Sequence, residues 1–146
     1  MKKTQKKLGN KGFSLVELIV VIAIMAVLVG VLAPTLIKNV EKSREAKDDQ
    51  NLDTVRSAIT TMLADEDYNT YLCGGSVTVV GESGAVNVTG ATGKTLPNGK
   101  TDATTELTDT IGSTGCKLTA NKNRTQTFTF SISDKGVITR TNKNTK

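Results

Sequence analysis

An uncharged apolar run constrains this chain more than any other feature of its sequence. Residues 18–37 carry no charge, and the run ends at Lys38. As an α-helix it would be about 30 Å long, which matches the hydrocarbon core of a bilayer. Five lysines and no acidic residue precede Glu17, at positions 2, 3, 6, 7 and 11. This charge bias predicts an N-terminus that stays in the cytoplasm and a remainder that is delivered outward.

The net charge of +5 belongs to this N-terminal segment. Residues 13–146 carry 14 basic and 14 acidic side chains, so they are neutral as a whole. A nucleic-acid-binding protein usually presents a basic surface. We therefore expect no nucleic-acid partner.

Residues 38–146 are long enough for one modest core. Only 3% of the chain is aromatic, and the second half is rich in Thr, Asn, Gly and Ser, which favours a β-rich extracellular module. We expect the helix to continue over residues 38–67. Within it, an apolar stripe at helical spacing should pack against a sheet, and its members are Leu52, Val55, Ile59, Met62 and Leu63.

The remainder of the chain predicts strands joined by loops. Short Val- and Thr-rich strands are expected at residues 76–80 and 85–89, and residues 90–123 are expected to be mostly loop, with a strand near 116–119. Residues 125–133 alternate, with Phe128, Phe130 and Ile132 on one face. A turn at 134–136 and a returning strand at 137–141 should complete an antiparallel hairpin.

The two cysteines, Cys73 and Cys116, lie in the part expected outside the cytoplasm. An even count there permits one disulfide, and the alternative is two buried thiols. The predicted compartment favours the bridge.

The sequence lacks the usual catalytic constellations. It has no His, which excludes Ser-His-Asp and Cys-His arrangements, and it has no phosphate-binding GxxxxGK[ST] motif. Two cysteines without histidine make a poor zinc site, and no calcium-loop spacing occurs. We expect no enzyme activity, no cofactor and no metal.

Glu17 is the one charge at the head of the apolar run. A carboxylate carried into a membrane costs up to ~3 kcal/mol, so an acid in this position predicts a function and a partner. The preceding residues are informative: from Lys11 onward the chain reads KGFSLVEL.

This junction, Gly12-Phe13-Ser14-Leu15-Val16-Glu17 behind a lysine-rich leader, resembles the class III signal of type IV prepilins and pseudopilins. The resemblance covers about residues 11–40. It implies that a prepilin peptidase cuts after Gly12 and methylates Phe13, while the apolar helix is retained. It also implies that Glu17 neutralises the terminal amine of a neighbouring subunit, which sets the register of the polymer.

Two residues interrupt the apolar helix. Pro34 lacks a backbone donor and clashes with the carbonyl of Gly30, so a kink or local unwinding is expected there. Pro34 also matches the position of a bend in pilin helices. Two interpretations remain open: a filament helix that melts and extends, or an ordinary kink of a membrane helix.

The resemblance implies an α+β, pilin-like fold, with a long N-terminal helical spine packed on a small antiparallel sheet. The expected organisation is a cleaved leader (1–12), a transmembrane and assembly helix (13–37) and an extracellular globular domain (38–146). Because thirty residues follow Cys116, the chain is more similar to pilins of Gram-positive bacteria, such as clostridia, than to Gram-negative ones.

The implied function is that of a structural pilus subunit, stored in the cytoplasmic membrane and polymerised into a surface filament for adhesion and motility. Its implied partners are copies of itself, the prepilin peptidase, and an assembly platform with its ATPase. The alternatives are a pseudopilin of a type II secretion or competence system and, from another class, a membrane-anchored binding module.

Overall fold

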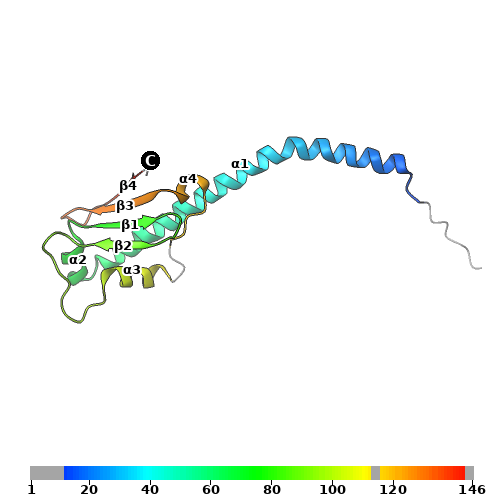
Figure 1. The fold of residues 1–146 in the computed structure, drawn as a ribbon. Coiled ribbons are helices and arrows are strands. Elements are labelled where there is room, and N and C mark those ends of the chain that lie inside the picture. The colour runs from blue at the N-terminus through cyan, green and yellow to red at the C-terminus, as the bar shows by residue number, and fades with distance from the viewer. Residues whose placement is uncertain (1–11, 113–115, 144–146) are drawn as a thin grey trace, which may run out of the picture. The chain divides into compact units, whose positions relative to one another are not determined.

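The computed structural model describes residues 12–112 and 116–143, and it divides the chain into two units, Met1–Asn39 and Val40–Lys146. The leader expected at 1–12 lies outside the described residues except for Gly12. One helix, α1 (Leu15–Met62), runs from the first unit into the second (Figure 1). Among its described residues, the first unit contains no element other than this helix.

The second unit contains a four-stranded antiparallel sheet and short helices. The strands are β1 (Ser76–Val80), β2 (Val86–Thr89), β3 (Thr127–Ile132) and β4 (Ile138–Lys143), in the spatial order β2-β1-β3-β4. Within this unit the sheet covers one side of α1, and α3 (Ala103–Ile111) runs beside β2 (Figure 1). The predicted α+β, pilin-like fold is confirmed.

The core lies between the sheet and the second half of α1. Leu52, Val55 and Ile59 of the predicted stripe are fully buried. The strands contribute cross-strand pairs on their inner face, Val77 with Phe130 and Val79 with Phe128. Alternation with period two in the strands and helical spacing in α1 therefore bury one continuous apolar layer.

The predicted end of the first helix is wrong. The helix ends at Met62, and a second helix, α2 (Glu66–Leu72), begins after three intervening residues. Asp65 is the N-cap of α2, because its side chain accepts a hydrogen bond of 3.0 Å from the backbone of Asp67. The acids at 65–67 thus start a helix, which suits the positive end of its dipole.

The stretch from 90 to 123 contains helices that the sequence reasoning missed. In α3 the N-cap Asp102 accepts from the backbone of Thr104 and Thr105, and the buried Ala103 and Leu107 follow at a spacing of four. A single turn, α4 (Asn121–Arg124), lies ahead of β3. The strand expected near 116–119 is absent from this described segment.

The expected disulfide is not formed, because Cys73 and Cys116 are free buried thiols. Cys73 precedes β1, whereas the backbone of Cys116 bonds to Gly84 in the turn that follows β1. The strand between these places spans roughly 13 Å, and the Cα atoms of a disulfide lie about 4.4–6.8 Å apart. Burial raises the pKa of the Cys116 thiol to about 11, with the Asp48 carboxylate adding to the effect.

One buried charge was also missed. Asp48 is fully buried one turn before Leu52, and its oxygens accept hydrogen bonds from Thr119 N (2.8 Å), Thr119 Oγ1 (3.2 Å), Ala120 N (2.9 Å) and Asn123 Nδ2 (3.0 Å). Burial alone would raise the pKa of this carboxyl, but the hydrogen bonds, led by that of Thr119 N, hold it below its usual value. Asp48 thereby fixes the segment before α4 onto α1. The N-cap of α4 itself, Ala120, makes no side-chain capping hydrogen bond.

Candidate functional site

The candidate site is the beginning of the chain's described part, from Gly12 to the end of the apolar run. Every residue from Gly12 to Leu32 is exposed. An 18-residue window of α1 has a mean hydropathy of 3.1, and none of that window is buried inside the protein. By length and composition this helix can cross a membrane, and within the described residues no other helix meets that test.

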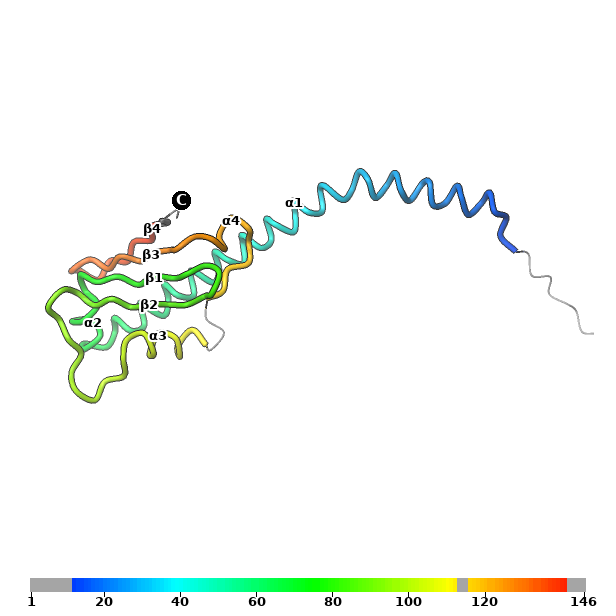
Figure 2. Tube along the Cα trace, viewed as in Figure 1, coloured from blue at the N-terminus to red at the C-terminus, as the bar shows by residue number. Residues whose placement is uncertain are grey.

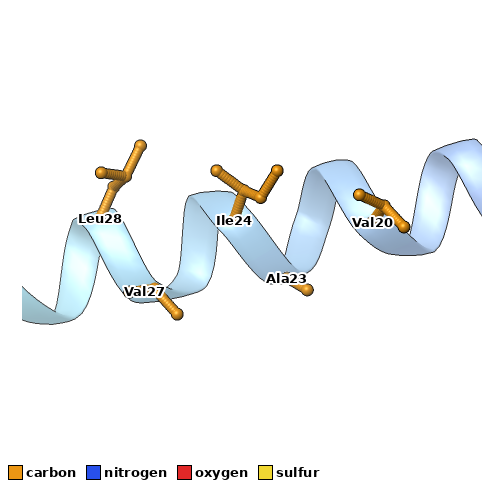
Figure 3. A pocket seen from close by; sticks show the side chains of 5 residues that line it. All are labelled: Val20, Ala23, Ile24, Val27 and Leu28. Atoms are coloured by element: carbon orange, nitrogen blue, oxygen red, sulfur yellow. The ribbon is translucent and has the colours of Figure 1, made fainter.

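Five apolar residues line a hollow in the middle of this segment, and all five are exposed. In Figure 3, Val20, Ile24 and Leu28 stand on one edge of the helix and Ala23 and Val27 on the other, and their side chains contain only carbon. An apolar helix with no cover from its own chain must be covered by lipid or by other helices.

The helix begins with one of the two hydrogen bonds of a capping box. Ser14 immediately precedes the first helical residue, and its backbone N–H donates to Glu17 Oε2 at 2.8 Å. A carboxylate at the third helical position satisfies a donor that has no partner within the helix, and it faces the positive end of the helix dipole. The sequence reasoning missed this role, although the S-x-x-E signature of residues 14–17 is visible in the sequence.

Phe13 and Glu17 lie close together at this helix end. With Leu18 and Val21 they line one shallow hollow, and the Phe13 side chain is 81% exposed. If the chain were cut after Gly12, the new amine of Phe13 would be one residue from the donor that Glu17 now caps. The geometry therefore brings the predicted cleavage residues and the predicted register residue into one place.

In the described part of the chain, no atom crowds position 12. A Cβ added at Gly12 would meet nothing within 4 Å. By contrast, a Cβ at Gly75 would lie 2.3 Å from the carbonyl oxygen of Thr89. A requirement for glycine at position 12 would thus have to come from an outside partner that approaches the backbone closely.

Gly30 and Pro34 both lie inside α1, which is helical without interruption through them. The local unwinding expected there is not present, and a kink stays a prediction. A Cβ at Gly30 would also meet no atom within 4 Å.

Residues 7–33 match the family model described as "Prokaryotic N-terminal methylation motif". This match spans the junction at Gly12, the hydrogen bond from Ser14 to Glu17 and most of the apolar run. The chain carries the class III signal of type IV pilins and pseudopilins. No curated protein matches the chain, and no solved structure does.

The class III signal has consequences for how the chain is processed and assembled. It implies processing by a prepilin peptidase and assembly into a pilus-like polymer, with membrane anchoring before assembly. The motif supports a type IV pilin-like or pseudopilin precursor, and the family that carries this motif is structural rather than enzymatic. Among the described residues there is no group of three side chains suited to a metal ion.

Proposed function

We propose that this chain is the precursor of a type IV pilus subunit, and that residues 1–12 are removed as a leader. Residues 13–37 then serve as the membrane and assembly helix, and residues 38–146 form the extracellular globular domain. The observation that carries this proposal is the bare apolar helix of α1 directly behind a class III signal. The polymer buries this helix against copies of itself, and the surface filament serves adhesion and motility without enzyme activity in the subunit.

The proposed roles follow from the helix end. Gly12 is the last residue of the leader, Phe13 is the methylated terminus, and Glu17 sets subunit register by pairing with a neighbour's amine. An assembly platform and its ATPase supply the work of extraction. A pseudopilin of a secretion or competence system is the second candidate, since it carries the same signal.

The first test is the mass and the N-terminal residue of the protein isolated from the cell surface. The proposal predicts a chain that begins at N-methylated Phe13. A surface chain that still begins at Met1, or one that is cut after Ala33, would contradict it. Long surface filaments made mainly of this chain would favour the pilus, and short periplasm-spanning assemblies would favour the pseudopilin.

The second test separates the charge of Glu17 from its capping hydrogen bond. Glu17→Gln keeps an acceptor that can cap the helix but removes the charge, whereas Glu17→Ala removes both. If pairing with a terminal amine sets register, both variants lose filaments. Filaments in Glu17→Gln but not in Glu17→Ala would show that only capping matters.

A further inference from the structure

A groove on the second unit is lined by four cationic side chains. Arg44 and Lys47 lie one turn apart on α1, Lys117 precedes the α4 turn, and Arg124 ends it. Leu118 and Thr119 complete its lining. We call this surface the basic groove.

The positive charge of the basic groove is only loosely compensated. Arg44 lies 3.7 Å from Glu41 and Arg124 lies 3.9 Å from Glu82, both near the limit for an ion pair. Within the described part of the chain, the side chains of Lys47 and Lys117 have no hydrogen bond or ion pair. Two cations therefore remain available for a ligand.

The basic groove is built on a fixed support. The buried Asp48 accepts from the backbone of Thr119 and Ala120, and Glu41 accepts from the backbone of Asn121. These two carboxylates of α1 hold the 117–121 segment in place, and their oxygen atoms accept hydrogen bonds from that segment. A groove whose walls are fixed before binding loses little entropy when a ligand enters.

A cluster of opposite charge gathers around the start of α2 and α3. Its carboxylates are those of Asp65, Glu66, Asp67, Asp102 and Glu106. Lys100 compensates part of them, with Nζ 2.6 Å from Asp65 Oδ2 and 3.4 Å from Asp67 Oδ2. The nearby Tyr68 hydroxyl has a raised pKa, first through burial and then through Glu106. We call this cluster the acidic end.

The basic groove and the acidic end lie at opposite ends of the second unit. Figure 2 shows α4 at one end of the sheet and α2 at the other. From Lys47 to the last helical residue, Met62, α1 rises about 22 Å. The unit is thus electrically polar, although residues 13–146 are neutral as a whole.

We propose that the basic groove of one copy binds the acidic end of a second copy. This inference rests on the proposed function, because it describes how globular units meet in the filament. Copies in an open polymer are related by a rotation and a translation, so each contact joins two different surfaces of the same chain. Oppositely charged ends make that contact attractive in one orientation and repulsive in the reverse one, which selects head-to-tail order.

The first experiment is zero-length carbodiimide cross-linking of intact filaments, followed by peptide mass spectrometry. The reagent joins a lysine amine to a carboxylate only where the two are in contact. The expected product links Lys47 or Lys117 to Glu66, Asp67 or Asp102, and this link is intermolecular because the two ends of one copy lie too far apart. If filaments form without such a link, this inference falls and the proposed function stands. If the native chain forms no filament, both fall.

The second experiment exchanges the charges. Lys47→Glu and Glu66→Lys should each reduce the filament yield roughly tenfold, because like charges then face each other, and the double variant should recover it. Lys42→Glu is the matched control, since it makes the same charge change on an exposed lysine of α1 that does not line the groove, and it should leave the yield unchanged. The membrane-stored pool at native level verifies folding of each variant.

Two results would overturn the inference. One is a Lys47→Glu variant with full filament yield. The other is a double variant no better than Lys47→Glu alone, which would mean that the groove serves a different anion, such as a phosphate-bearing ligand.

Discussion

The two halves of α1 have opposite relations to the rest of the chain. In the described structure, the apolar window of the first half is exposed along its whole length, whereas the part in the second unit buries Leu52, Val55 and Ile59 beneath a sheet. Both halves are apolar on at least one side and both are helical. The difference teaches that the apolar residues of the first half suit an environment outside the chain, whereas those of the second half suit the core of its own fold.

The largest effect should come from the same substitution placed in each half. Leu52→Asp puts an unpaired carboxylate at a fully buried position, which should cost at least about 4 kcal/mol in the free energy of unfolding. That loss should leave the globular unit largely unfolded. Urea titration of the full chain in detergent micelles, followed by circular dichroism, measures it.

Leu28→Asp is the matched change in the first half, at a position whose side chain is exposed (Figure 3). It should leave the urea midpoint of the globular unit unchanged while it weakens membrane insertion by up to about 3 kcal/mol. An equal loss of folding stability in Leu52→Asp and Leu28→Asp would show that both halves of α1 contribute to the folded core, which contradicts this comparison.

Asp48 should be the next most sensitive position. Asp48→Ala leaves the backbone donors of Thr119 and Ala120 and the amide of Asn123 without their acceptor, which should cost about 2–4 kcal/mol. The neighbour Asp49 is the control, since it makes an exposed pair with Arg140 at 3.2 Å. Asp49→Ala should cost about 1 kcal/mol or less, and similar losses at 48 and 49 would contradict the role assigned to burial.

Periodicity was enough to predict the elements that bury an apolar face. The stripe on α1 and the alternation of Phe128, Phe130 and Ile132 each have one physical cause, burial on one side, and both are confirmed. The turn predicted at 134–136 is also present. Gly136 has a φ of 74°, and residues 133 and 137 are hydrogen-bonded across the turn.

Polar roles were harder to predict because they depend on partners distant in sequence. Asp48 lies on the apolar stripe at helical spacing, yet its donors are more than seventy residues away. Asp65 could be taken for the last turn of one helix or the cap of the next, and only the packing of α2 decides. The disulfide prediction failed for the same reason. Cys73 lies before β1 and Cys116 lies near the turn after β1, and only the topology of the fold places them at these opposite ends of the strand.

The candidate site was easier to predict from the sequence than these polar contacts, because its residues are close together in the chain. Gly12, Phe13 and Glu17 were identified by a motif whose parts are adjacent, and residues 7–33 match the corresponding family model. Their proposed roles stay predictions. The capping hydrogen bond from Ser14 to Glu17 was equally local and could have been recognised.

Acid should weaken the second half of the molecule through Asp48. The pKa of Asp48 is lower in the folded protein than its usual value of 3.8, so the unfolded chain binds the proton more readily. The stabilisation is therefore present above pH 3.8 and is lost as the pH falls below it, through the folded pKa. Unfolding measured across this range should show the free-energy gap between the native chain and Asp48→Asn narrowing as the pH falls, and a constant gap would contradict the assignment.

The smallest expected effect comes from a substitution that changes only the helix propensity of the first half of α1. Gly30→Ala introduces a Cβ that meets no atom within 4 Å, so it should stabilise the local helix by about 0.5–1 kcal/mol. Hydrogen exchange of the amides at 30–34, measured on the full chain in micelles, should slow while the urea midpoint stays fixed. The reverse change in the second half, Ala58→Gly, removes a buried methyl group as well as helix propensity, so it should lower the midpoint. If Gly30→Ala instead raised the midpoint, the first half would be part of the folding unit, and the comparison between the halves would fail.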